Sequence, residues 1–414
     1  MHSVRHTRWI AAASLATAGL ATAAHAQPET LACGPWSALP TPVWEGLFMA
    51  ADPSVIRTHD GTYVMHFTGF MPEPERATIG VATSPDGITW DWAGPTTFEE
   101  PFVFALDGRP GEWDEQLETV AVIERGTDAN PEYWMYYTGY VVDESRFVSP
   151  YEIGLATSTD GITFTRASNN PVLRLEPPGI NDAPTNDFAM TSPGVVEHDG
   201  VLYMVFLAWG GDANGTPDFF ELRGAFSTDP EGLVWQRHPD PVLPFPIDGL
   251  PEIDGAVEPG LLKGSNGRFY LFITADDAEN PTSPSSIAVL TSCHPFGPWM
   301  SCGDLAVEMT QPWHDDEIIA PHAIEDDGLL RVYYHGLTFN DALTGERFRV
   351  GYAEAPFTPG PSPDTNGDGQ LSPNDFNAWI LAFNAQSAAC DQNGDGRCTP
   401  GDFNAWVLNF NVGC

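Results

Sequence analysis

Positive charge is scarce in this 414-residue sequence. It has 17 Lys and Arg residues against 57 Asp and Glu, a formal net charge of -40, and Lys263 is its only lysine. Binding to nucleic acid or to an anionic membrane surface needs clustered basic residues. The composition therefore excludes a nucleic-acid-binding protein and a basic membrane-docking face, and it predicts neutral or cationic partners. A hydrophobic content of 42% still allows a large folded core.

Long apolar runs are also missing after the first residues. Residues 1–26 are typical of a secretory signal peptide, with Arg5 and Arg8, then an uncharged Ala-rich stretch that ends at Ala24, and a small-x-small cleavage pattern that ends at Ala26. The stretch is shorter than the about 20 residues that a membrane helix needs, although a single-span anchor is the alternative. We therefore expect an exported protein, secreted or at the cell surface, with no membrane span in the mature chain.

Several catalytic signatures are lacking. The sequence shows no Ser-His-Asp triad, no glycine loop of the kind that binds phosphate and no zinc-type histidine cluster. Six cysteines are present, and an even number in an exported protein favours disulfides over metal-thiolate sites. We expect one disulfide between Cys293 and Cys302 and one among Cys390, Cys398 and Cys414, with Cys33 left unassigned.

An internal repeat dominates the rest of the chain. The phrase ATSPDGITW at 82–90 recurs as ATSTDGITF at 156–164, with weaker copies at 225–235, 289–299 and 351–357. About 30 residues before each copy lies a second phrase, and these phrases begin near residues 52, 118, 192, 258 and 320.

Each repeat contains short runs rich in Val, Ile, Tyr, Phe and Trp that are separated by Asp-Gly or Asn-Gly turn signals. This pattern predicts a four-stranded antiparallel meander in each repeat. Five such units predict an all-β, five-bladed β-propeller over residues 27–357, with a single open sheet as the alternative. The fifth unit lacks its outermost strand, and we expect residues 31–48 to supply it.

A different repeat follows a Pro-rich linker at 358–363. DTNGDGQLSPNDFNAWILAFN at 364 recurs as DQNGDGRCTPGDFNAWVLNFN at 391. The acidic and amide residues have the spacing of EF-hand-type calcium loops, in which hard oxygen ligands surround the ion. Residues 364–414 are therefore predicted to bind two calcium ions. The predicted ligands are Asp364, Asn366, Asp368, Gln370 and Asp375 in the first loop, and Asp391, Asn393, Asp395, Arg397 (through its carbonyl) and Asp402 in the second.

Each loop leads into a predicted short helix. Ser372-Pro373 and Thr399-Pro400 provide a capping hydroxyl followed by proline at the first helical position. Apolar residues then recur at helical spacing, and we expect the two apolar faces to pack on each other as the core of the module. These residues are Phe376, Trp379, Ile380 and Phe383 in the first copy and Phe403, Trp406, Val407 and Phe410 in the second.

The paired loop and helix, with Asp at the twelfth loop position, resembles dockerin type I modules. The resemblance implies a small α-helical, dockerin-like domain over residues 364–414 that attaches an enzyme to a cohesin-like or cell-surface partner. Positions 10 and 11, which usually carry the partner-reading side chains, are Pro373-Asn374 and Pro400-Gly401 here. This departure disfavours a standard cohesin partner.

The first residues of the innermost strands point towards the central channel of a propeller, so a site is expected there. In register these positions are Asp52, Glu118, Ser192, Glu258 and Ala320. Three carboxyl groups from three units would thus converge. Glycoside hydrolysis needs such convergence, because one carboxyl group protonates the leaving oxygen while another acts as base or nucleophile.

Residues 45–357 resemble the five-bladed glycosidase superfamily, nearest to glycoside hydrolase family 43. The resemblance rests on Asp52-Pro53, on Glu258-Pro259-Gly260 and on the Thr-Ser-x-Asp-Gly-Ile-Thr-Trp phrase. It implies that Asp52 is the catalytic base and Glu258 the acid. It also places His322 at the channel axis, where the alternative is a buried core histidine.

One carboxylate of that family is missing, because the third unit opens with Thr191-Ser192. Asp187, slightly preferred because it lies on the expected unit, or Glu118 could replace it. Aromatic side chains near the unit openings could stack on sugar rings, although a core position is the favoured interpretation of each one alone. The candidates for substrate binding are Trp44, Trp113, Trp209 and His322, with Trp313 as a further aromatic.

The sequence thus predicts a secreted glycosidase that acts on polysaccharide or oligosaccharide and is tethered by a calcium-binding module. A phosphorolytic enzyme is disfavoured because a phosphate pocket needs cations. The alternative is a non-catalytic carbohydrate-binding or surface-assembly propeller, which Ser192 and Ala320 favour because neither carries a carboxyl group.

Overall fold

A computed structural model describes most of residues 33–412. The predicted signal peptide lies outside the described residues. Within the span, the ranges that are not described are 46–49, 73–74, 93–103, 143–149, 176–186, 212–216, 277–284, 303–304, 342–344, 358–362, 367–370 and 393–396, together with residues 246, 248, 249, 251, 252 and 254.

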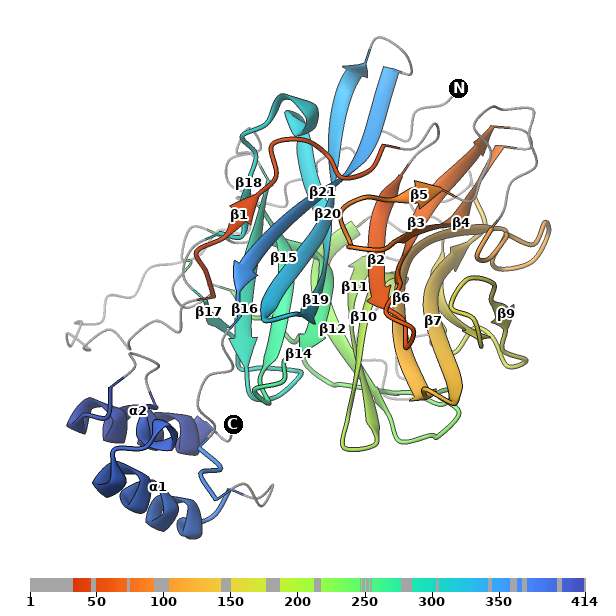
Figure 1. The fold of residues 1–414 in the computed structure, drawn as a ribbon. Helices are drawn as coiled ribbons and strands as arrows, with labels where there is room; N and C mark the ends of the chain where they lie inside the picture. The colour runs from red at the N-terminus through yellow and green to blue at the C-terminus, as the bar shows by residue number, and fades with distance from the viewer. Residues whose placement is uncertain are drawn as a thin grey trace, which may run out of the picture.

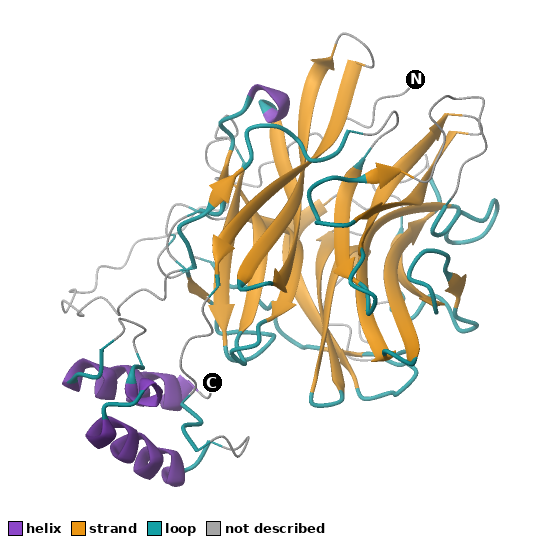
Figure 2. Cartoon of the chain, viewed as in Figure 1, coloured by secondary structure: helices purple, strands orange, loops and turns teal. Residues whose placement is uncertain are grey.

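Five consecutive units of antiparallel strands make up the larger part of the described chain (Figures 1 and 2). The first unit contains β2 (Ala51–Arg57), β3 (Tyr63–Pro72), β4 (Glu75–Ser84) and β5 (Asp91–Trp92). The second contains β6 (Gln116–Thr127), β7 (Asn130–Tyr140), β8 (Tyr151–Ser158) and β9 (Thr165–Arg166). The third contains β10 (Asp187–His198), β11 (Val201–Gly211), β12 (Pro217–Ser227) and β13 (Gln236–Arg237).

The fourth unit contains β14 (Gly255–Lys263), β15 (Phe269–Asp276), β16 (Ser286–Ser292), β17 (Met300–Ser301) and β18 (Val307–Glu308). The fifth contains β19 (Glu317–Asp326), β20 (Leu329–Asp341) and β21 (Gly345–Pro356), preceded by the 3-10 turn η1 (Pro312–His314).

The innermost strands contact each other in a closed cycle, β2 with β6, β6 with β10, β10 with β14, β14 with β19, and β19 with β2. The mainly β, propeller-like architecture predicted from the repeat is confirmed.

The N-terminal segment completes the last unit. β1 (Ser37–Ala38) pairs with β21, with Ser37 opposite Glu354, and Trp44 forms a further bridge to Val350. The prediction that residues 31–48 supply the outermost strand is therefore confirmed. Without this pairing β21 would have a free edge with unpaired backbone groups.

The repeated Asp-Gly phrase forms a turn that connects neighbouring units. The Asp86 carboxylate accepts hydrogen bonds from the backbone amides two and three residues later, at 2.8 and 2.7 Å, and Gly87 has φ +76°. The Gly87 carbonyl accepts a bond from the Tyr333 hydroxyl of the fifth unit at 2.9 Å. In the second copy, the Gly161 carbonyl lies 2.8 Å from Nε2 of the buried His66 in the first unit. The first two copies of the phrase thus make the same turn, each against the preceding unit of the cycle.

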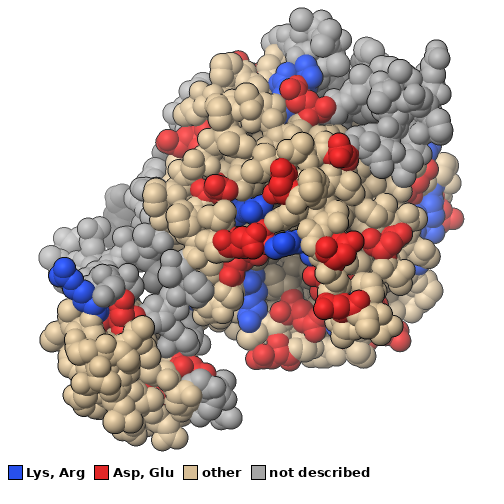
Figure 3. Space-filling model, in the orientation of Figure 1, with Lys and Arg blue, Asp and Glu red and all other residues tan. Residues whose placement is uncertain are grey.

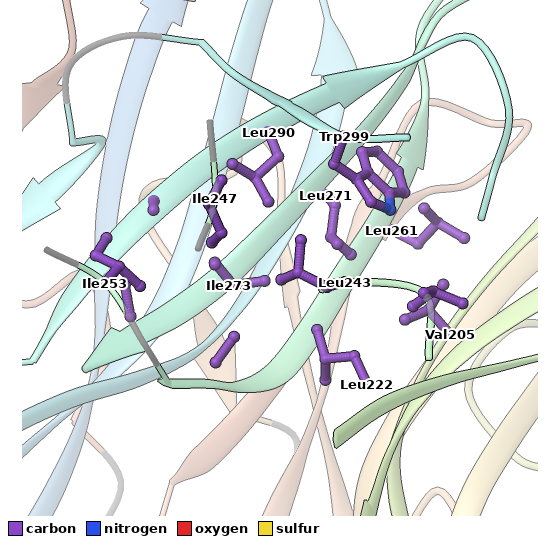
Figure 4. Packing of buried hydrophobic residues seen from close by; sticks show 14 of the residues in the cluster. Val205, Leu222, Leu243, Ile247, Ile253, Leu261, Leu271, Ile273, Leu290 and Trp299 are labelled. Carbon is purple, nitrogen blue, oxygen red and sulfur yellow. The ribbon is translucent and has the colours of Figure 1, made fainter. Parts of the chain in front are cut away.

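Aliphatic side chains fill the space between neighbouring units. Between the third and fourth units, Val205 and Leu222 pack with Leu261, Leu271 and Ile273 (Figure 4). Each of these side chains is less than 9% exposed, and burial of one such side chain stabilises the fold by about 1.5–3 kcal/mol. This packing holds the innermost strands in place around the centre.

Gly260 allows two innermost strands to approach closely. A Cβ at this position would lie 2.2 Å from the backbone oxygen of Pro321 on β19, so no other residue fits without a backbone shift. The close approach of β14 and β19 brings Glu258 next to the fifth unit.

One predicted disulfide is wrong and one is confirmed. Cys302 is bonded to Cys33, with Cα atoms 5.2 Å apart, and not to Cys293, which is bonded elsewhere. The Cys33 amide also donates to the Cys302 carbonyl at 3.3 Å, because the N-terminal segment lies against the fourth unit. Cys390 and Cys398 are bonded, as predicted for this group of cysteines.

The C-terminal module consists of α1 (Pro373–Ala385), the 3-10 turn η2 (Ala388–Cys390) and α2 (Pro400–Val412). The predicted helix start is confirmed, since Ser372 and Asp375 form a capping box with Pro373 at the first turn. Trp379 and Trp406 are each 5% exposed and form the module core with partly buried Phe376, Phe383, Val407 and Phe410, as predicted. Phe403 is 40% exposed but contacts Phe376 and Trp379 of the other helix, with ring centroids 5.8 and 5.6 Å apart. Ile380 differs from the prediction, because it remains 37% exposed.

Acidic side chains are spread over the face shown in Figure 3, and the few basic ones lie close to them. Arg57 and Arg331 both contact Asp326, for example. Among the helices of the described residues, none has the length and apolar character needed to cross a membrane.

Candidate active site

A cavity at the centre of the cycle of strands is lined by equivalent positions of all five units. These positions share an unusual backbone conformation, with φ between +38° and +53°, although none of them is glycine. A left-handed non-glycine residue is strained, and such residues concentrate at functional sites. The five positions are Asp52, Thr119, Ser192, Glu258 and Ala320.

Each of these residues lies in a β-bulge of its strand. In β2, β10, β14 and β19 two residues leave the ladder, and the second of them is a proline, which has no N–H to donate. In β6 only Thr119 leaves the ladder, because Val120 is not proline and pairs with Tyr137. The predicted register is therefore wrong by one residue in the second unit, where Thr119 and not Glu118 occupies the equivalent position.

Asp52 is held from two sides. The Thr68 hydroxyl donates to Oδ2 at 2.6 Å, and the Asp52 amide donates to Nδ1 of His335 at 3.1 Å. Thr68 also accepts a bond from the Thr119 amide at 2.9 Å, which directs its own hydroxyl hydrogen towards Asp52. Two of the five units therefore fix the orientation of this carboxylate, which a catalytic base requires.

Glu258 is in a different environment. Burial raises the pKa of its carboxyl group well above the usual value, and the nearby charges of Asp52, Glu317 and Glu118 raise it further. Its Oε2 atom is buried and has no hydrogen-bond partner among the described residues. A carboxyl group with a raised pKa next to an oriented carboxylate is the arrangement of an acid and a base.

Glu118 belongs to the same cluster although it does not line the cavity. Burial, and next the charge of Asp52, raise its pKa to about 8. The Thr191 hydroxyl donates to Glu118 Oε1 at 3.4 Å, and the nearby Tyr140 also lowers the pKa of this carboxyl group. The sequence identified Glu118 from its place in a repeat, whereas Glu317 was missed because it precedes the repeated phrase of its unit.

The third unit brings no described carboxyl group into the cavity. Its equivalent position is Ser192, whose amide donates to the Thr119 and Thr138 hydroxyl groups at 3.1 and 3.2 Å. Asp187, the other candidate for the third carboxylate, begins β10 opposite Gly210, and its side chain lies outside the described structure. Among the described residues, Glu118 is the candidate that lies beside Asp52 and Glu258.

His322 lines the cavity, as the prediction of a channel position requires. Its Nδ1 accepts a bond from the Val55 amide at 3.3 Å. Burial, and then the neighbouring His66, lower the pKa of His322 to about 4, so its ring is neutral near pH 7. A neutral imidazole can donate from Nε2 to a hydroxyl group of a ligand.

The tryptophan candidates lie outside the cavity lining. Trp44 is 7% exposed and packs in the core of the first and fifth units. Trp113 stacks on Tyr137 with ring centroids 5.8 Å apart, and Trp313 stacks on Tyr334 at 6.1 Å. Trp209 is partly exposed and contacts Tyr151 and Phe220.

Solved structures with the same arrangement of strands are numerous. A complex of BT0996 with RGII matches with a TM-score of 0.57 and 17% identity over 77% of this chain and 90% of the other. One described as "Glycoside hydrolase" matches with a TM-score of 0.56 and 15% identity over the same shares. The Bombyx mori GH32 beta-fructofuranosidase BmSUC1 matches with a TM-score of 0.52 and 13% identity over 76% of this chain and 61% of its own.

The chain shares the fold of these glycoside hydrolases. No family model and no curated protein matches the sequence. The glycoside hydrolase fold is therefore established by the course of the backbone, whereas the chemistry rests on the cavity itself.

The predicted calcium loops lie only partly within the described residues, because Asp368, Gln370, Asn393 and Asp395 are outside them. Asp375 and Asp402, the twelfth residues of the loops, are fully buried. Each reaches back across its loop, Asp375 to the Asn366 amide at 3.3 Å and Asp402 to the Gln392 amide at 2.8 Å. Among the residues that are described, no group of three or more His, Cys, Asp and Glu side chains gathers as a metal site. The buried carboxylates at the loop ends fit a calcium ion.

Replacement of Glu118 by glutamine is expected to stabilise the protein at pH 8. The native Glu118 stays protonated up to about pH 8, whereas the unfolded chain ionises near 4.5, so rising pH favours unfolding between these values. Glutamine removes this penalty, which amounts to about 3 kcal/mol near pH 7. Thermal unfolding should show a gain for Glu118→Gln at pH 8 that vanishes near pH 4, and none for the exposed control Glu308→Gln. An equal gain at both pH values would contradict the assignment.

Proposed function

We propose that this chain is an exported glycoside hydrolase in which Glu258 is the general acid and Asp52 the base. The observation that carries the proposal is that both occupy the same strained position of the innermost strand, on the first and fourth units of one cavity. The carboxyl group of Glu258 is buried and has a raised pKa, and that of Asp52 is oriented by the Thr68 hydroxyl. The shared fold of solved glycoside hydrolases supports this reading.

The two carboxyl groups would divide the reaction as follows. Glu258 donates its proton to the glycosidic oxygen of the leaving sugar, and Asp52 removes a proton from the attacking water. Glu118 takes the part of the third carboxyl group, because it lies close to Glu258 and its carboxyl group, once ionised, raises the pKa of Glu258 further. His322 would donate a hydrogen bond to a sugar hydroxyl group within the cavity. The substrate of this reaction is a polysaccharide or oligosaccharide. The domain that carries the site is a propeller of five blades.

The C-terminal repeat is proposed to be a calcium-binding, dockerin-like module of residues 364–414. The ligands would be the loop residues predicted above, with Asp375 and Asp402 closing the two sites. Its partner would be a cohesin-like or cell-surface protein. The module would recognise this partner through side chains other than those at loop positions 10 and 11. The disulfides Cys33–Cys302 and Cys390–Cys398 support export, because such bonds persist in oxidising compartments.

The decisive experiment is sugar release by the purified protein from arabinan, arabinoxylan, galactan, fructan and mannan with calcium present. Release from one of them supports the hydrolase and names its substrate class. Retained binding to a glycan without release from any would instead establish the non-catalytic carbohydrate-binding propeller, which Ser192 and Ala320 in the equivalent positions favour.

A further inference from the structure

Four aromatic residues form a row across the second and third units. Tyr140 ends β7 and pairs with Tyr151, the first residue of β8, while Trp209 near the end of β11 pairs with Phe220 near the start of β12. The two halves of the row meet where β8 and β10 pair, at Tyr151 and Ala189. All four residues therefore lie at the same end of their sheets.

That end is the one that carries the candidate acid and base. Tyr140 lies opposite Gln116, two residues before Glu118, and Trp209 lies opposite Ala189, three residues before Ser192. The row thus begins beside the cavity and extends outward over the two units.

The rings contact one another in sequence. Tyr140 and Tyr151 stack with centroids 4.3 Å apart and an interplanar angle of 26°. Tyr151 and Trp209 follow at 6.2 Å, and Trp209 and Phe220 at 5.1 Å. The row adjoins the site, since Tyr140 and Tyr151 both lie close enough to Glu118 for its charge to raise their pKa values.

The outer end of the row is open. Phe220 is 43% exposed, and Trp209 and Tyr151 are partly exposed. An apolar ring surface that continues from a polar cavity suits a ligand that has both polar and apolar faces. A sugar is such a ligand, because it carries hydroxyl groups and apolar C–H faces. The continuity with the cavity indicates that this ligand is the part of a glycan chain that remains outside it.

We propose that the row of Tyr140, Tyr151, Trp209 and Phe220 binds sugar units of the glycan that lie beyond the cleavage point, on the side of the second and third units. This inference rests on the proposed glycosidase function. It means that the protein holds several consecutive sugars of one glycan, so its affinity rises with the length of the oligosaccharide up to the length that reaches Phe220.

The test compares two phenylalanines of equal exposure at the same end of the sheets. Phe220 and Phe339 are both 43% exposed, but Phe339 lies on β20 of the fifth unit, away from the row. Phe220→Ala and Phe339→Ala are made in the full chain that carries Glu258→Gln, so that bound oligosaccharide is not cleaved. Calorimetry then measures binding of oligosaccharides of two to six sugars from the five glycans named above.

We expect Phe220→Ala to weaken binding of the longer oligosaccharides about fivefold and to leave the disaccharide unaffected, with no change for Phe339→Ala. Equal losses in both variants, or none in Phe220→Ala while the wild-type protein cleaves the glycan and the Glu258→Gln protein binds it, would overturn the inference but not the glycosidase. A changed oligomeric state of Phe220→Ala without a change in binding would make the row a self-association surface. Failure of the wild-type protein to cleave any of the glycans, together with failure of the Glu258→Gln protein to bind one, would refute the glycosidase itself.

Discussion

Glu258→Gln is expected to reduce glycan hydrolysis by about 10²–10⁴-fold while the protein remains folded. Glutamine keeps the size of the side chain but cannot donate a proton to the leaving oxygen. Because burial raises the pKa of Glu258, wild-type activity should also fall as the pH rises through that raised value, when the acid ionises.

Asp52→Asn is expected to cause a loss of similar size for a different reason. Asparagine can occupy the contacts with Thr68 and His335 but cannot accept a proton from water. Glu308→Gln, at an exposed position on β18, serves as the control for the loss of one carboxylate. Initial rates on the best substrate of the panel, with circular dichroism to verify folding, measure all three variants.

Either variant with near wild-type activity would remove its residue from the mechanism. If both keep activity, the cavity is not the catalytic centre. If both lose it and Glu308→Gln does not, the paired carboxyl groups are the acid and the base.

Removal of calcium is expected to unfold the C-terminal module while the larger β domain stays folded. The module core contains little more than Trp379, Trp406 and the disulfide of Cys390, too small to fold securely without help. Asp375 and Asp402 are fully buried, and without the ion their charges would be compensated mainly by backbone amides of the loop and the helix start. A thousandfold excess of calcium over its Kd would stabilise the module by about 4 kcal/mol.

Calorimetric unfolding of the full chain with calcium and with a chelator measures this effect, with magnesium as the control cation. Titration should find two calcium ions in the wild type and one in either Asp375→Asn or Asp402→Asn. Unchanged unfolding with chelator, together with no heat of calcium binding, would show that the loops do not bind the ion.

Much of the fold could be read from the sequence because the information is local. The Asp-Gly turns, the alternating apolar runs and the period of the repeat are properties of neighbouring residues, and they predicted the mainly β architecture. The capping box at Ser372 and the packing of Trp379 on its module depend on residues a few positions apart, and both predictions are confirmed. The residues 31–48 were assigned to the last unit because that unit lacked a strand.

The candidate site could be located but not completed in this way. Repeated phrases pointed to Asp52 and Glu258 and the family resemblance to His322, and the structure places all three on one cavity. The register predicted from the repeated phrases was wrong at Glu118. In the bulge of β6 one residue leaves the hydrogen-bonded ladder, whereas two residues leave it in the other innermost strands. Glu317 was not identified from the sequence, because no repeated phrase contains it. It belongs to the site only because it lies close to Glu258 in the fold.

The sequence by itself determined the repeat, the turns, the helix starts and the spacing of the calcium loops, because each depends on short-range geometry of the backbone. Tertiary structure alone decided which side chain of each innermost strand faces the cavity, that Cys33 pairs with Cys302 at a separation of 269 residues, and that four aromatic rings from two units form one row. Those features depend on how separate units pack around a common centre, and no local pattern in the chain encodes that packing.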